Sequence, residues 1–225
     1  MLFLYRCGKL LVNGNVEGAM GNLQEQQIHQ YKCKGDRFEA MKRKTSKEIL
    51  AESFRELAEQ MPIDKITIQY IVKNCGYSPA TFYRQFKDKY DLIAWDYSRD
   101  VEKILDSVKG DYPSWKRALS DAAAYFDTQK GYIANLLLHT NGFDSFVRNM
   151  TEIHYNCFRK CILKSAGADC LDEKTEMYIR LYCQGTVALT GEWILGKYGV
   201  EAEELVEIYE EALPAPLNQY LYPQS

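Results

Sequence analysis

The sequence has few of the residues on which catalytic and metal sites are built. Its three histidines lie far apart in 225 residues, and it has no glycine-rich phosphate loop and no evident Ser/His/Asp order. The cysteines are odd in number and show no CxxC spacing: Cys7, Cys33, Cys75, Cys157, Cys161, Cys170 and Cys183. We therefore expect no enzyme, no cofactor and no metal, and reduced thiols in a cytoplasmic protein.

Long apolar runs are also missing. No stretch approaches the roughly 18 apolar residues that span a bilayer, so no membrane partner is expected. The opening MLFLYRCGKLLV is interrupted by Arg6 and Lys9, and no clear cleavage site of a signal peptide follows.

The net charge of the chain is small, but its charged residues are unevenly distributed. The net charge is −3; residues 41–95 carry ten Lys/Arg against seven Asp/Glu, and residues 101–225 carry twelve against eighteen. This distribution fits a protein that contacts phosphates with one part only. The 46% hydrophobic content is enough for a core in one or two small domains.

Residues 1–40 differ from the rest of the chain. They contain a glutamine-rich patch near Gln24 and no sustained hydrophobic period. We interpret them as a poorly ordered leader. The alternative is that translation begins at Met41, because every strong pattern follows that residue.

Residues 45–62 carry the signals of one helix. Thr45-Ser46-Lys47-Glu48 has the form of a capping box, in which Thr45 caps the helix and Glu48 reaches back. Apolar residues then recur at helical spacing on one face: Leu50, Phe54, Leu57, Ala58 and Met61. Pro62 ends the helix.

Two shorter helices and a tight turn follow. Thr67 is the predicted N-cap of the first helix, which stops at Cys75-Gly76, where Gly76 can adopt a left-handed conformation. Ser78 caps the second helix, and Pro79 occupies its first turn. This order of elements predicts a helix-turn-helix.

The rest of the chain also has helical spacing. The predicted helices lie at about 88–108, 113–128, 130–139, 143–166, 172–197 and 201–213. No alternating strand pattern is present after Met41. We predict an all-α protein of about nine helices, with a DNA-binding domain at 41–92, an effector-binding and dimerisation domain at 93–216 and a tail at 217–225.

The stretch ITIQYIVKNCGYSPATFYRQFKDKYDLI resembles the TetR-family DNA-binding signature. The matching positions are Thr67, Ile71, Gly76, Ser78, Thr81, Phe82, Tyr83, Phe86, Lys89 and Leu92. YFDTQKGYIANLLLHTNGFDSFVRNM and TGEWILGKYG resemble the Firmicutes-type TetR C-terminal domain. The family implies a three-helix helix-turn-helix domain followed by a larger helical regulatory domain. Cys75, Tyr77 and Ala80 depart from the usual alanine, valine and glycine, which leaves the base preference open.

The resemblance and the local chemistry together predict the residues that contact DNA. Small or polar residues at the start of a recognition helix let its backbone approach the bases, and hydroxyl and basic groups suit phosphates. The predicted set is Thr67, Ser78, Pro79, Ala80, Thr81, Tyr83, Arg84, Lys87 and Lys89. Tyr83 and Lys89 resemble the family's phosphate-contacting residues, although each is also compatible with an ordinary surface position. Phe82 and Phe86 are assigned to the core, and the basic run 42–44 to a solvated arm or a groove-binding arm.

One helix-turn-helix contacts too few bases for specificity in a genome, so we expect a homodimer on a palindromic double-stranded operator. The resemblance implies that the last two helices pair with their counterparts. The predicted interface contains Tyr178, Leu181, Tyr182, Gly185, Leu189, Trp193, Leu205, Ile208 and Tyr209. The alternative is that these residues fill the core of one copy.

The family further implies an effector, either a small molecule or a partner protein. Candidate lining residues are Trp115, Phe126, Tyr132, Phe143 and His154, which are equally compatible with plain core. His154, Cys157 and Cys161 share one helix face, but no fourth metal ligand is evident, and buried thiols are common. The overall hypothesis is a transcription regulator, either a repressor or an activator. A helical interaction module without specific DNA binding is the alternative.

Overall fold

The computed structural model describes residues 44–140 and 145–222, which lie in the compact unit Lys44–Ser225. Across these residues it contains ten α-helices, two short 3-10 helices and no β-strand. The all-α prediction is thus confirmed. The predicted leader 1–40 and Phe143 lie outside the described residues.

The first three helices begin and end where local signals predict. Helix α2 spans Ser46–Ala58 and starts with the complete capping box of Thr45 and Glu48. Helix α3 spans Ile68–Asn74, and the side chain of its N-cap Thr67 accepts a hydrogen bond from the Tyr70 amide. Helix α4 spans Pro79–Gln85 and begins at Ser78, whose side chain accepts from the Thr81 amide. Between α3 and α4, Gly76 has a φ of 72°, a conformation that costs other residues energy.

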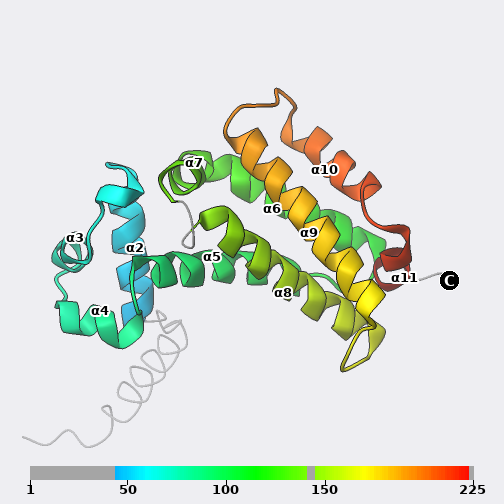
Figure 1. Ribbon diagram of the computed structural model, residues 1–225, viewed down its shortest axis with the longest axis horizontal. Coiled ribbons are helices and arrows are strands. Elements are labelled where there is room, and N and C mark those ends of the chain that lie inside the picture. Colours follow the sequence, from blue (N-terminus) through cyan, green and yellow to red (C-terminus); the bar gives the residue numbers. More distant parts are fainter. Residues whose placement is uncertain (1–43, 141–144, 223–225) are drawn as a thin grey trace, which may run out of the picture. The chain divides into compact units, whose positions relative to one another are not determined.

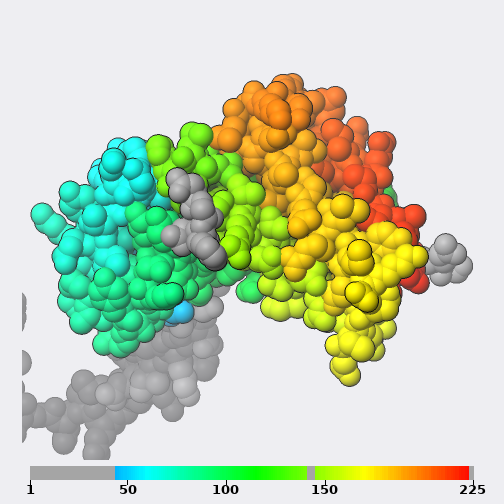
Figure 2. All heavy atoms as spheres, in the orientation of Figure 1, coloured from blue at the N-terminus to red at the C-terminus, as the bar shows by residue number. Residues whose placement is uncertain are grey.

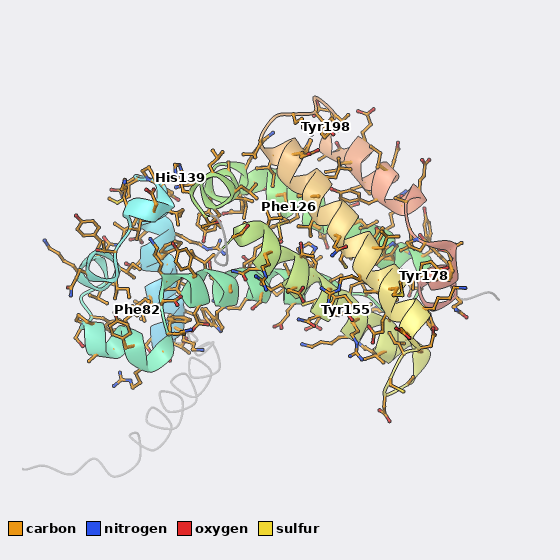
Figure 3. All side chains as sticks on the ribbon, in the orientation of Figure 1. Phe82, Phe126, His139, Tyr155, Tyr178 and Tyr198 are labelled. Atoms are coloured by element: carbon orange, nitrogen blue, oxygen red, sulfur yellow. The ribbon has the colours of Figure 1, made fainter. Side chains whose placement is uncertain are left out.

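These three helices form a unit around apolar side chains. Phe54 of α2, Ile71 of α3 and Phe82 of α4 are each fully buried. Figure 3 shows Phe82 between the helices. Phe86 follows α4, and its ring lies beneath the Lys47 ammonium of α2, which confirms that Phe82 and Phe86 belong to the core. We call α2, α3 and α4 the three-helix unit.

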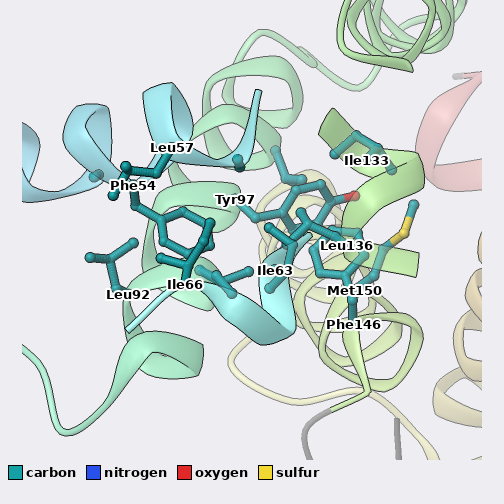
Figure 4. Packing of buried hydrophobic residues seen from close by; sticks show 14 of the residues in the cluster. Phe54, Leu57, Ile63, Ile66, Leu92, Tyr97, Ile133, Leu136, Phe146 and Met150 are labelled. Carbon is teal, nitrogen blue, oxygen red and sulfur yellow. The ribbon is translucent and has the colours of Figure 1, made fainter. Parts of the chain in front are cut away.

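The remaining helices pack against one another behind α5. Their bounds are α5 Lys89–Asp106, α6 Tyr112–Thr128, α7 Lys130–His139, α8 Phe146–Ala166, α9 Glu173–Ile194 and α10 Ala202–Glu211. Helix α8 runs along α9 and α5, and α10 runs along α6 (Figure 1). One hydrophobic cluster continues from the three-helix unit into these helices through Ile63, Leu92, Tyr97 and Phe146 (Figure 4).

The C-terminal segment is more ordered than the predicted tail. After α10 come a 3-10 helix, η4 (Ala215–Leu217), and the one-turn helix α11 (Asn218–Leu221). Leu217 and Leu221 are fully buried in a cluster with residues of α6, α8 and α9. The prolines of this segment interrupt any helical period, so the sequence did not predict α11. The burial of Leu217 and Leu221 stabilises it. The other 3-10 helix, η2 (Ile63–Lys65), was also not predicted.

The predicted limits of α9 and α8 shift slightly. Helix α9 ends at Ile194, three residues before the predicted end, because Gly196 takes a φ of 77°. Helix α8 begins at Phe146 instead of residue 143, but residues 141–144 are not described. In the described part of the chain, no helix is long and apolar enough to cross a membrane.

Candidate DNA-binding surface and ligand cavity

The outer surface of the three-helix unit presents most of the predicted DNA contacts. Thr67, Ser78 and Ala80 are exposed, while Pro79 and Thr81 are half-buried. The hydroxyl groups of Ser78 and Thr81 are hydrogen-bonded, with 3.1 Å between their oxygens, and both lie at the start of α4. The start of α4 therefore offers small polar groups and lets a duplex approach the backbone closely.

Tyr83 is the most exposed aromatic residue of this surface. Its side chain is 60% exposed, and its ring packs edge-on against the buried Phe82 at 5.7 Å between centroids. The contact fixes the ring while the hydroxyl end lies at the surface. Arg84 and Lys87 are exposed on the same unit and add positive charge. The surface thus presents one hydrogen-bonding group and two cations, a combination that suits a phosphate backbone.

Lys89, a predicted phosphate contact, is hydrogen-bonded inside the protein. Its ammonium donates to three backbone oxygens, those of Ile63 at 2.9 Å, Asp64 at 3.3 Å and Ile66 at 3.0 Å. Burial lowers its pKa. An ammonium has three donors, and all three are used inside the protein. Lys89 ties the start of α5 to the segment before α3.

Two polar residues connect the three-helix unit to the helices behind it. Arg55 of α2 pairs with Asp96 at 2.5 Å and with Asp100 at 2.8 Å, both on α5. Burial lowers the pKa of Arg55, but the charge of Asp96 and its hydrogen bond raise it by more, so the guanidinium stays charged. Its cation also lies 5.2 Å from the ring centroid of Tyr132 on α7.

Asn135 of α7 makes the second connection. Its amide nitrogen donates to the backbone oxygens of Ala58 at 2.8 Å and Met61 at 3.0 Å. Its side-chain oxygen accepts from the backbone amide of Ile63 at 3.1 Å. One side chain thus satisfies three backbone groups between the end of α2 and η2, where helix ends leave such groups unpaired.

A cavity lies among α5, α6, α8, α9 and α10. It has a free volume of about 80 Å³ and is partly open to solvent. Of the predicted effector-lining residues, Trp115, Phe126 and His154 line it, and Tyr132 does not. Figure 3 shows Phe126 among these helices. No sequence pattern pointed to Tyr125, Thr186 or Thr190, which also line the cavity.

His154 is held in the cavity wall by Tyr97. Its Nε2 and the Tyr97 hydroxyl lie 2.6 Å apart, and the two rings stack with centroids 5.9 Å apart. Burial lowers the pKa of His154 to about 4, so the ring is neutral at pH 7. Burial also raises the pKa of Cys157 and of Cys161 to about 11. Within residues 44–140 and 145–222, no group of three or more His, Cys, Asp and Glu is placed to hold a metal.

The predicted dimer residues divide into two groups. Tyr182, Trp193 and Leu205 are at most 7% exposed and pack within one copy. Tyr209 is also used internally, because its hydroxyl bonds to Thr190 at 2.6 Å. For these residues the packing within one copy favours the alternative of core packing, and their contact with a second copy stays a prediction. Helical spacing alone did not separate the two faces of α9.

The other side of α9 is exposed and largely apolar, with Gln184 as a polar residue within it. Met177 is 66% exposed and Leu181 65%, and Gly185, Ala188 and Leu195 follow along the same side of the helix. We call these five residues the exposed α9 face; Figure 2 shows α9 at the surface of the viewed side. Tyr178 and Leu189 flank it half-buried, and Ile208 of α10 is 41% exposed. A Cβ on Gly185 would have no heavy atom within 4 Å, whereas a Cβ on Gly191 would contact Leu137 of the same copy.

Sequence patterns did not point to Arg55 or Asn135. Both are polar residues inside segments with apolar periodicity, FRELA and YIANLLL. A polar side chain at such a position signals a buried hydrogen-bond partner, but the sequence does not say which partner.

Comparisons with known proteins agree with this geometry. Residues 49–94 match the sequence profile of "Bacterial regulatory proteins, tetR family". A curated relative, the HTH-type dhaKLM operon transcriptional activator DhaS of Lactococcus lactis subsp. lactis (strain IL1403), is 21% identical over 101 residues. That match covers 45% of this chain and about half, 54%, of the relative.

Two solved structures share the fold. The dihydroxyacetone kinase operon activator DhaS has a TM-score of 0.55 at 18% identity and covers 78% of this chain and 97% of its own. A TetR transcriptional regulator from Rhodococcus sp. RHA1 has a TM-score of 0.56 at 17% identity, with coverages of 73% and 92%. At these identities the likeness concerns the fold alone. The matched residues 49–94 contain the three-helix unit except for the start of α2.

Proposed function

Because residues 49–94 match the model of bacterial regulatory proteins of the tetR family, we propose that this chain is a sequence-specific transcription regulator. It acts as a homodimer on a palindromic DNA operator. The observation that carries the proposal is the surface of the three-helix unit. There, small polar groups begin α4, and Tyr83, Arg84 and Lys87 are exposed beside them.

The proposed DNA contacts follow from this arrangement. The start of α4 enters the major groove, with Ser78, Ala80 and Thr81 near the base edges. Tyr83, Arg84 and Lys87 contact phosphates, which sets the position of the unit on the duplex. Lys89 takes no direct part and instead supports the start of α5.

The exposed α9 face supports the homodimer. Its large apolar side chains are exposed in one copy, and a two-fold axis brings the same surface of two copies together. Gly185 and Ala188 allow two helices to approach closely. The dimer places two copies of α4 about 34–36 Å apart, one turn of DNA, or slightly more.

The proposed regulation uses the helices behind the three-helix unit. Tyr125 lines the cavity. Burial raises the pKa of its hydroxyl, and the positive charge of the nearby Arg55 opposes this rise. Arg55 belongs to α2 and pairs with α5. A small molecule in the cavity, or a partner protein that moves these helices, thereby changes the position of the three-helix unit.

The test is fluorescence anisotropy of labelled DNA from the region flanking the protein's own gene, with unrelated DNA as competitor and at several salt concentrations. We compare Tyr83→Ala with Tyr112→Ala, which removes a 44% exposed tyrosine from α6. Hydrogen bonds to charged groups contribute about 1.5–3 kcal/mol, so Tyr83→Ala should weaken binding about tenfold or more. Tyr112→Ala should leave it unchanged.

Circular dichroism establishes that both variants are folded. Equal affinity of the two folded variants for the same DNA contradicts the proposed contact. Equal, weak and strongly salt-dependent binding to specific and unrelated DNA contradicts sequence-specific recognition at this region and favours an interaction module.

A further inference from the structure

The cavity has an uncharged lining. Among the described residues that line it, none is Asp, Glu, Lys or Arg. The imidazole of His154 has a pKa lowered by burial to about 4 and is hydrogen-bonded to Tyr97. A charged ligand would lose its hydration here without gaining an opposite charge, which is strongly unfavourable.

Most of the polar groups in the lining are already paired. The Tyr182 hydroxyl donates to the backbone oxygen of Tyr209 at 2.8 Å. Thr186 donates to the backbone oxygen of Tyr182 at 2.9 Å, and Thr190 pairs with the Tyr209 hydroxyl at 2.6 Å. A ligand therefore gains little by competing for these groups.

Trp115 is one of two exceptions. Its side chain is buried, with the residue 3% exposed, and its indole Nε1 has no hydrogen-bond partner among the described residues. The ring is fixed by stacking on Phe158 at 5.0 Å between centroids. An indole N–H can only donate, and buried donors without an acceptor are rare. This donor is therefore left to a water molecule or to a ligand that enters the cavity.

The Tyr125 hydroxyl is a second buried group of the lining without a hydrogen-bond partner among the described residues. Burial raises the pKa of this hydroxyl, and the guanidinium of Arg55 lies close enough to oppose the rise. This hydroxyl is neutral at pH 7 and can donate to the same ligand. Both unpaired groups thus favour an oxygen acceptor.

We propose that this cavity binds an uncharged small molecule with an apolar body and an acceptor oxygen, of the ketone, ether or ester class, and that Trp115 Nε1 donates to that oxygen. The inference rests on the proposed regulatory function and names the ligand class of its cavity. A cavity of roughly 150 Å³ holds benzene. The free volume of about 80 Å³ therefore accommodates the oxygen-bearing end, and the remainder of a larger ligand extends through the open side.

The experiment uses the full chain labelled with ¹⁵N at tryptophan and three cyclopentane-based probes: cyclopentanone, cyclopentylammonium and cyclopentanecarboxylate. Each is titrated while the indole N–H resonances are recorded by NMR. Trp115→Phe assigns the Trp115 resonance. Trp193 serves as internal reference, because its Nε1 already donates to the Val200 oxygen at 2.8 Å.

We expect cyclopentanone to shift the Trp115 resonance saturably, with affinity on the order of millimolar for so small a molecule. The Trp193 resonance stays unchanged, and neither charged probe binds. Trp115→Phe keeps the aromatic packing but removes the donor, and should weaken cyclopentanone binding about tenfold, as measured by calorimetry.

Three results overturn the proposal: no saturable ketone binding, binding of a charged probe as tight as that of the ketone, or unchanged ketone affinity in folded Trp115→Phe. The titration contains no DNA, so its failure is distinct from failure of operator binding. A protein that binds the ketone but no specific DNA would keep the ligand site and lose the proposed regulatory function.

Discussion

The substitution Leu181→Glu tests the exposed α9 face as a dimer interface. Full burial of a leucine stabilises by about 1.5–3 kcal/mol. In one copy Leu181 is 65% exposed, so a partner that covers it contributes about 1–2 kcal/mol. A two-fold dimer buries the residue twice, which gives about 2–4 kcal/mol. At about 1.4 kcal/mol per tenfold change, the dissociation constant of the dimer should rise roughly 30-fold or more.

The matched control is Leu138→Glu. Leu138 lies on α7 and is 63% exposed, so the two substitutions change the same residue type at almost the same exposure on different surfaces. Sedimentation equilibrium over a range of protein concentrations measures both dissociation constants, and urea unfolding checks that both variants fold. If both variants dissociate alike, or neither differs from the wild type, the assignment of the interface to α9 is refuted.

Two further predictions concern the connections inside one copy. Asn135→Ala removes the partner of three backbone groups and should lower the unfolding free energy by about 2–3 kcal/mol, whereas the exposed Asn156→Ala should change it by less than about 0.5 kcal/mol in the same urea titration. His154 has a folded pKa of about 4, below its ordinary 6.5, so the unfolded chain binds the proton first as pH falls, and stability decreases from about pH 6.5 to pH 4 and is constant above. Wild type should lose about 3 kcal/mol more than His154→Gln over this range; equal losses would show that His154 does not titrate as its burial implies.

Much of the first half of the fold could be predicted because its signals are local. The Thr45–Glu48 capping box, the Gly76 turn and the Ser78-Pro79 start each act within about four residues along the chain. Caps and turns restrict the backbone whatever packs against it later. The order helix, turn, helix could therefore be predicted from the sequence, and so could the small polar groups at the start of α4.

The contacts of Lys89 and of the last helices could not be predicted from local signals in the sequence. Lys89 follows the family pattern, yet its ammonium binds carbonyls 23–26 residues earlier in the chain. Periodicity shows that α9 has apolar residues on more than one side. It does not show which side faces the rest of the same copy, so the sequence could not distinguish the buried Tyr182 from the exposed Leu181.

The sequence by itself thus determined the all-α class, the limits of most helices and the helix-turn-helix, because capping, turn conformation and helical period depend on near neighbours. Only the tertiary structure decided which apolar side chains are buried and that Arg55 meets Asp96 across 41 residues. It also decided that the indole donor of Trp115 has no partner among the described residues around a neutral cavity. Those features depend on how separate helices are placed against one another. That placement is set by the joint packing of many side chains, and no local pattern contains it.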